Sequence, residues 1–304
     1  MGLVGVAKDI TNKKDPILCG LLEDLFRKYH RPSFFSSDPI EFPHNYKNCE
    51  DREAVALLSA LLAYGNVKQI RKSISTLLER IGEPASFVHS LSSNRGYRQG
   101  RKVLSGFIHR FNRGEDVLLL LRLLSETWEK YGSLNRHFER LVGENDVDIG
   151  GALTRLIEEW SRSAIAIGIE SPSFNYFLTS PAKGSACKRW CMFLRWMIRK
   201  DEIDLGLWNS RVLRPKMLII PLDTHTARIS RYFGLTSRKS ADWRMALEVT
   251  NALKSFDIED PTKYDFAISR LGILDLCQKR FRVEICKRCE LLPGCLYARK
   301  RIGK

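Results

Sequence analysis

Apolar residues recur at three-to-four spacing along almost the whole chain, and this periodicity is the feature that most restricts the fold. This periodicity predicts helices over residues 53–63, 67–81, 118–131, 135–142 and 152–167. One more helix is predicted to open at Asp260-Pro261, a cap residue followed by proline, and to end near Gly272. Strand-like alternation is confined to the short run 217–220, which is too short to decide. We therefore expect an all-α fold.

The charge balance favours a polyanionic partner. Fifty Lys and Arg oppose 35 Asp and Glu, which leaves +15 in a chain of 304 residues. Such an excess attracts nucleic acid because each phosphate that is neutralised releases condensed counterions. Simple solubility is the other explanation of this charge. A hydrophobic share of 44% is ordinary for a globular protein and allows one large domain or two closely packed ones.

No segment suggests export or a membrane. The N-terminus lacks a basic segment ahead of an apolar one, and the most apolar run, 117–124, is short and interrupted by Arg122. We expect a cytoplasmic protein in a reducing compartment, so its eight cysteines should not form a disulfide framework.

Four of these cysteines gather near the C-terminus. Cys277, Cys286, Cys289 and Cys295 give the spacing C-x8-C-x2-C-x5-C. Four thiolates from one short loop suit a [4Fe–4S] cluster or a zinc ion, and the spacing does not separate the two. The same loop is strongly basic, as a loop that touches DNA phosphates or a solvated loop would be; its cations are Lys279, Arg280, Arg282, Lys287 and Arg288.

A second segment predicts a turn followed by a helix. Residues 180–185 form the turn and 186–199 the helix. Backbone N–H groups at Gly184 and Ser185, beside Lys183, would bind a phosphate at the helix start. The helix has a buried stripe of Ala186, Trp190, Leu194, Met197 and Ile198, while Lys188, Arg195 and Arg199 share another face. Taken alone, Lys188 is more simply a surface lysine than a nucleophile.

A third segment, 221–229, starts another helix. Asp223 stands where an N-cap belongs, and that is its simplest structural role. His225 in the first turn is more simply a packed side chain than a metal ligand.

Together the three segments resemble the helix-hairpin-helix DNA glycosylase superfamily, which includes endonuclease III, the adenine glycosylase MutY and the archaeal 8-oxoguanine glycosylases. Leu222-Asp223-Thr224-His225-Thr226-Ala227-Arg228-Ile229 matches its V-D-T-H-V-x-R-V-type motif. Residues 180–189 occupy the place of its L-P-G-V-G-x-K-T-A hairpin, and the four cysteines match its C-x6-C-x2-C-x5-C loop with a longer first spacer. The chain is similar to a bacterial branch of this superfamily.

The resemblance implies two helical lobes with DNA in the cleft between them. Residues 51–217 would form one lobe, and residues 1–50 with 218–304 the other, which carries the cluster loop 277–295. Lys188 and Asp223 would be the catalytic pair, although the 35 positions between them require an insertion around 201–216. The four cysteines would hold a [4Fe–4S] cluster.

The implied function is base-excision repair: a monomeric glycosylase with AP-lyase activity that removes a damaged base, such as an oxidised purine, from double-stranded DNA. The expected DNA contacts are Lys183, Gly184, Ser185, Arg189, Tyr64, Asn66 and Gln69. Phe107, His109, Arg110 and Phe111 would either line the base pocket or fill the core. The alternative is a nucleic-acid-binding protein, with iron–sulfur or zinc, that has lost catalysis. In both cases we expect a nucleoid-associated protein with no membrane partner.

Overall fold

The computed structural model describes residues 15–167 and 171–303. In this part of the chain every element is helical apart from one two-stranded antiparallel hairpin, which confirms the all-α expectation. No helix in these residues is both long enough and apolar enough to cross a membrane. The α-helices are α1 (Pro16–Tyr29), α2 (Glu41–His44), α3 (Cys49–Leu61), α4 (Val67–Ile81), α5 (Pro84–Ser90), α6 (Asn94–Val103), α7 (Gly114–Tyr131), α8 (Leu134–Arg140), α9 (Gly150–Ala166), α10 (Pro172–Asn175), α11 (Lys188–Ile198), α12 (Thr224–Tyr232), α13 (Trp243–Lys254), α14 (Asp265–Ile273), α15 (Val283–Cys286) and α16 (Leu296–Ile302).

Shorter elements connect these helices. The strands β1 (Ile108–His109) and β2 (Asn112–Arg113) pair Ile108 with Arg113 and His109 with Asn112. The 3-10 turns are η1 (Pro32–Ser37), η2 (Pro181–Lys183), η3 (Pro215–Met217) and η4 (Leu292–Gly294).

Local capping explains where the helices begin and end. Asn66 accepts the backbone N–H of Lys68 and starts α4, and Gly82, with φ 68°, ends it, so the predicted helix 67–81 is confirmed. Most other helices differ from their predicted bounds by a few residues. The helix expected from Asp260 is wrong at its start. Asp260 accepts a hydrogen bond from Arg199 Nε (2.8 Å), residues 261–264 form a turn, and the helix begins only at Asp265.

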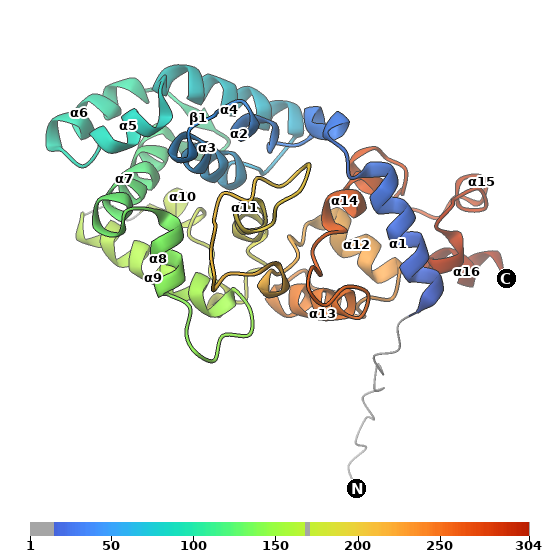
Figure 1. Ribbon diagram of the computed structural model, residues 1–304. Helices are drawn as coiled ribbons and strands as arrows, with labels where there is room; N and C mark the ends of the chain where they lie inside the picture. Colours follow the sequence, from blue (N-terminus) through green and yellow to red (C-terminus); the bar gives the residue numbers. More distant parts are fainter. Residues whose placement is uncertain (1–14, 168–170, 304) are drawn as a thin grey trace, which may run out of the picture.

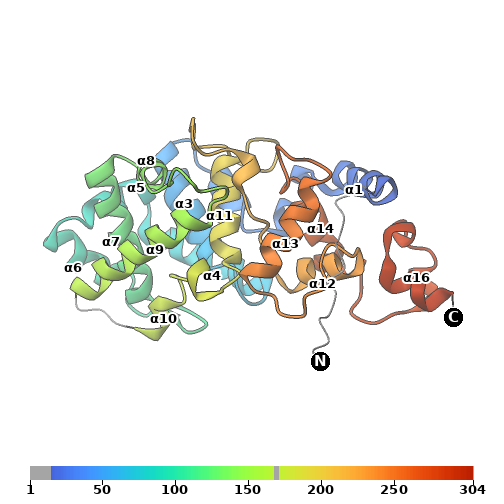
Figure 2. The same cartoon turned by 90° about the horizontal axis from the view of Figure 1, so that it is seen from below.

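The helices fall into two groups in space. Helices α2–α11 lie together on one side, and α1 joins α12–α16 on the other, where it packs against α14 (Figure 1). The view from below shows the same division, with α11 at the edge of the first group that faces the second (Figure 2). Helix α2 belongs to the first group because it packs against α3.

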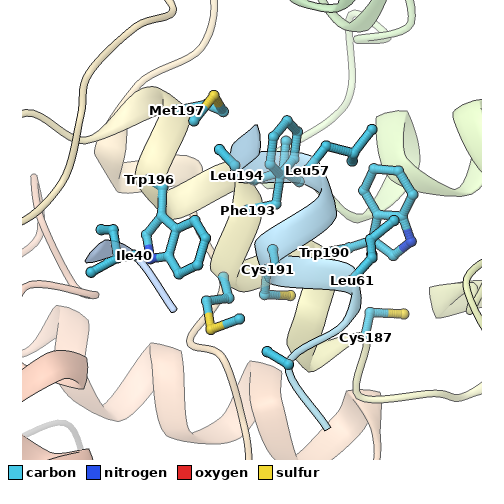
Figure 3. Close-up of a cluster of buried hydrophobic side chains, with 14 of the residues drawn as sticks. Ile40, Leu57, Leu61, Cys187, Trp190, Cys191, Phe193, Leu194, Trp196 and Met197 are labelled. Atoms are coloured by element: carbon cyan, nitrogen blue, oxygen red, sulfur yellow. The ribbon is translucent and has the colours of Figure 1, made fainter. Parts of the chain in front are cut away.

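Helix α11 forms the centre of the core. Its aromatic side chains Trp190, Phe193 and Trp196 are fully buried. Phe193 lies next to Leu57 and Trp190 next to Leu61 of α3, while Trp196 lies next to Ile40 (Figure 3). Each of these indole or phenyl groups contributes roughly 1.5–3 kcal/mol or more through the apolar surface that it buries. Because α11 is enclosed along its length, the residue at its first position is held on a rigid support.

Residues 201–216, the stretch expected to be an insertion, are folded against this core. Trp208 donates its indole N–H to Glu53 Oε1 (2.7 Å), and Trp128 of α7 donates to Oε2 of the same carboxylate (2.7 Å). Glu53 is buried, and burial raises the pKa of its carboxyl group. One side chain of α3 therefore joins α7 and the insertion.

Arg195 and Arg199 do not line a solvent face with Lys188 as their spacing suggested. Both are buried, with 3% and 5% of their surface exposed. Arg195 pairs with Asp204 (3.2 Å) and Asp265, while Arg199 pairs with Asp204 (2.9 Å) among others. The carboxylates come from the insertion and from α14, so this buried ionic network ties the two helix groups together.

Replacing Arg195 with Met should be strongly destabilising. The change leaves the buried carboxylates of Asp204 and Asp265 without a main partner, which typically costs about 3–5 kcal/mol. Urea denaturation should show a lower midpoint at an unchanged slope. The matched control, Arg162→Met, alters an exposed arginine of α9 and should leave the midpoint unchanged. If Arg195→Met and the control had equal midpoints, the ionic network would not contribute to the stability of the protein.

Candidate active site

The amine of Lys188 and the carboxylate of Asp223 meet where the two helix groups adjoin. Lys188 Nζ lies 3.7 Å from Asp223 Oδ2, and the side chains are 34% and 18% exposed. Lys188 is the first residue of α11, and Asp223 is the N-cap of α12. The fold thus brings together two groups that are 35 positions apart in the sequence.

The capping role of Asp223 fixes its carboxylate. Oδ1 accepts the backbone N–H groups of His225 (2.8 Å) and Thr226 (2.7 Å). These bonds hold one oxygen at the positive end of the helix, where a carboxylate is favoured, and leave Oδ2 facing Lys188. The simple structural role and the predicted catalytic position therefore coexist in one side chain.

Lys188 and Asp223 share an open groove with a volume of about 980 Å³. Its walls come from both groups: Tyr64 and Asn66 precede α4, Tyr176 follows α10, and Phe266 belongs to α14. The groove is far larger than a water site and has the size of a cleft that admits a large ligand. The pair is thus reachable from solvent.

The turn before Lys188 is built by side-chain and backbone bonds. Gly184 has φ 76°, and its carbonyl accepts the N–H of Trp243 (3.0 Å), which docks the turn on α13. Ser185 Oγ accepts the N–H of Cys187 (3.2 Å), and Cys187 has φ 47°, so the helix begins at Lys188 instead of 186. Lys183 and Gly184 are exposed, and Ser185 lines the groove.

Arg189 is not placed to contact DNA as expected. It is 6% exposed, donates to the carbonyl oxygen of Leu61 (2.7 Å) and to that of Tyr176, and lies over the Tyr176 ring with its guanidinium carbon 4.0 Å from the centroid. Its guanidinium is used inside the protein because α11 turns this face toward α3. Arg189 therefore supports the wall of the groove instead of offering its charge to a phosphate.

The expected DNA contacts around the start of α4, Tyr64, Asn66 and Gln69, differ in their surroundings. Tyr64 and Asn66 both line the groove, and Asn66 also caps α4. Tyr64 stacks on Phe111 (5.3 Å between centroids) and is half-buried, which raises the pKa of its phenol. Gln69 is exposed and bonds to Ser73 Oγ (3.2 Å); it is not among the residues that line the groove.

The expected pocket residues of the 107–111 segment divide between core and surface. Phe107 and His109 are buried, whereas Arg110 and Phe111 are exposed on the hairpin between β1 and β2. None of the four lines the groove directly. The β1–β2 hairpin contacts the groove indirectly, because its Phe111 stacks on Tyr64, which lines the groove.

The sequence reasoning missed a second carboxyl group at the groove. Asp265, the first residue of α14, lines it together with Asp223. Burial and the charge of Asp223 raise the pKa of Asp265 to about 7, while Arg195 opposes this rise. No local motif marks Asp265, because its position depends on the pairing of α14 with α11.

The four C-terminal cysteines line one small open cavity of about 50 Å³. Their thiols are close enough that the charges of Cys295, Cys289 and Cys286 add to burial in raising the pKa of Cys277 to about 11. Within residues 15–167 and 171–303, no group of three or more His, Cys, Asp or Glu is closed into an arrangement that could hold a metal ion. The donor set fits a thiolate-bound centre in its chemistry and in sharing one cavity.

The cavity is joined to α12 and surrounded by cations. Arg228 Nη2 donates to the carbonyl oxygen of Cys277 (2.7 Å), and Tyr232 lines the cavity and stacks on Tyr297 (4.2 Å). The five expected basic residues of the loop are all exposed.

Comparison with known proteins gives one match. A family model described as "Protein of unknown function (DUF2400)" matches residues 38–274. No curated protein matches the chain, and no solved structure matches it. The matched region includes Lys188 and Asp223 and ends before the four-cysteine loop.

Proposed function

The chain belongs to the family of proteins of unknown function named DUF2400, and we propose from its site that it is a DNA base-excision glycosylase with AP-lyase activity. The observation that carries this proposal is the amine of Lys188 within 3.7 Å of the capped carboxylate of Asp223 in an open groove. A nucleophilic amine beside a carboxylate is the pairing that covalent glycosylase chemistry requires.

We propose that the two groups of helices are the two lobes of a helix-hairpin-helix glycosylase. The turn from Ser180 to Ser185 would be the hairpin of this fold and would face a DNA phosphate beside Lys188. The N–H of Gly184 is used within the turn, where it donates to the carbonyl oxygen of Pro181 (2.8 Å). Double-stranded DNA would lie across the groove, with the damaged nucleotide extruded from the helix stack, because a base inside a duplex is out of reach. The net charge of +15 supports such a partner.

In the proposed reaction, Asp223 accepts a proton from the Lys188 ammonium group. The free amine attacks C1′ of the extruded nucleotide, the N-glycosidic bond breaks, and its electron pair leaves with the base, which takes up the proton that Asp223 had accepted. The carboxylate restored at Asp223 stabilises the positive charge on the sugar and the attached nitrogen. The nitrogen then passes a proton to the ring oxygen as the ring opens, which gives an iminium between Lys188 Nζ and C1′, and loss of a C2′ proton expels the 3′ phosphate by β-elimination.

Cys277, Cys286, Cys289 and Cys295 would hold a [4Fe–4S] cluster, with zinc as the alternative. Either centre would supply structural cross-linking of the loop, since four thiolates from one short segment would be fixed around it. The exposed cations of the loop would then be held in place for DNA phosphates.

Replacing Cys289 with Ala should reduce the bound metal from nearly one centre per chain to nearly none. Removing one of four thiolates opens the site, and the loop loses its cross-link. Elemental analysis of the purified protein measures this, and colour separates the alternatives, since an iron–sulfur protein is brown and a zinc protein is colourless. Cys49→Ala, at an exposed cysteine outside the cavity, is the control. Unchanged metal in Cys289→Ala would exclude the cavity as the site.

The function is tested with a panel of duplexes that each carry one damaged base. Release of a base from at least one duplex, with oxidised purines tested first, is the expected result, and borohydride should trap the protein on the same DNA. A chain that binds these duplexes tightly but releases no base would be a binding protein, and the enzyme proposal would be wrong.

A further inference from the structure

One stretch of the chain is basic without any acidic residue. Between Glu83 and Glu115 the sequence contains six Lys or Arg and no Asp or Glu. This stretch spans α6 and the β1–β2 hairpin. It therefore provides six of the positive charges behind a net charge of +15.

All six side chains are exposed, and none forms an ion pair with a residue that the structure describes. Four of them, Arg95, Arg98, Arg101 and Lys102, lie on the ten-residue helix α6, within one face at helical spacing. Like charges at this spacing repel one another and destabilise a helix. An anionic partner bound to this face of α6 would relieve the repulsion between its positive charges.

The basic stretch is continuous with the groove. Phe111 of the hairpin stacks on Tyr64, and Tyr64 Oη donates to the carbonyl oxygen of His109 (3.2 Å). Arg110 lies against Gly65, where its Nη1 is 2.9 Å from the position a Cβ would take. Tyr64 and Gly65 both line the groove. A partner seated in the groove would therefore meet Arg110 at the rim and α6 beyond it.

Helix α6 extends this surface to the end of the molecule. It lies at the far edge of the first helix group, at the opposite end from α16 (Figure 1), and the second view agrees (Figure 2). Phosphates at this edge would belong to the DNA on one side of the damaged nucleotide.

We propose that Arg95, Arg98, Arg101, Lys102, Arg110 and Arg113 form a flanking surface that binds the phosphates of duplex DNA beside the groove. The choice of DNA as the polyanion rests on the function proposed above. The surface fixes position along the duplex and carries no base preference, because phosphate contacts are the same for every sequence. It lengthens the DNA footprint beyond the Lys188–Asp223 pair.

The test compares two triple variants of the full chain on undamaged duplex DNA. One is Arg95→Gln, Arg98→Gln, Arg101→Gln, which removes three charges from α6. The matched control is Arg136→Gln, Arg140→Gln, Arg162→Gln, which removes three exposed arginines of α8 and α9. Affinity is measured over a range of salt. For the α6 variant the slope of log affinity against log salt should fall by about 2–3, near 0.9 for each lost phosphate contact.

The control variant should keep the wild-type slope, and neither variant should melt at a lower temperature than the wild type, since the α6 substitutions remove a repulsion. An unchanged slope in the α6 variant, or an equal fall in both variants, would overturn the flanking surface. A fall seen with duplex RNA but absent with duplex DNA would overturn it as well. These results leave the glycosylase proposal standing if the wild type still releases a base, whereas a wild type that binds no DNA would sink both.

Discussion

Asp223→Asn should reduce base release by at least about 100-fold while DNA binding is not weakened, since positioned acid–base groups contribute roughly this much or more. The amide cannot take a proton from Lys188 and carries no charge to stabilise the sugar. It still accepts the N–H groups of His225 and Thr226, because Asn is as good an N-cap as Asp. Single-turnover release from a lesion-bearing duplex, with Tm measured in parallel, separates the chemical from the structural effect.

Asp15 supplies a matched control. It caps α1 through the same two bonds, from the backbone N–H groups of Ile17 (3.0 Å) and Leu18 (3.2 Å), and does not line the groove. Asp15→Asn should leave base release at the wild-type rate. Equal rates in the wild type and Asp223→Asn would discard Asp223 as a catalytic residue and leave it only its capping role.

Lys188→Gln should abolish covalent trapping by borohydride and strand nicking together. The iminium that borohydride reduces forms on Lys188 Nζ, and an amide nitrogen does not form it. Base release should fall too, but less than in Asp223→Asn, because the carboxylate remains in place to activate water. The readouts are the trapped protein–DNA adduct on a denaturing gel and the nicked strand.

Lys183→Gln is the matched control for this variant. Lys183 is an exposed lysine of the same turn, five positions before Lys188, and with saturating DNA its loss should leave trapping intact. Trapping that persists in Lys188→Gln and disappears in Lys183→Gln would move the nucleophile to Lys183. Trapping that persists in both would place it elsewhere in the chain.

The elements set by nearby residues were predictable from the sequence. Helix α4 matches its predicted bounds because both of its ends are fixed locally, by the cap Asn66 and by Gly82 with positive φ. The start of α14 was not predictable in this way. Asp260 looked like a cap, but its carboxylate bonds to Arg199, which lies 61 positions away.

The buried arginines show a different limit. A row of charged residues on one helix face has the same spacing whether it faces solvent or a set of buried carboxylates. The partners of Arg195 come from the insertion and from α14, so only the tertiary structure reveals them. Asp265 was not predicted from the sequence for the same reason. The nearness of Lys188 and Asp223 was expected from the resemblance and not from their separation in the chain.

Asp223, which faces Lys188, caps the start of α12. Tyr232, the last residue of the same helix and nine positions after Asp223, lines the cavity of the four cysteines. A substitution that shifts this helix would therefore move both ends, and activity alone would not show which end caused the effect. Changes meant to affect the cysteine loop alone should therefore be made in α15, because α16 packs against α12 and its Tyr297 stacks on Tyr232.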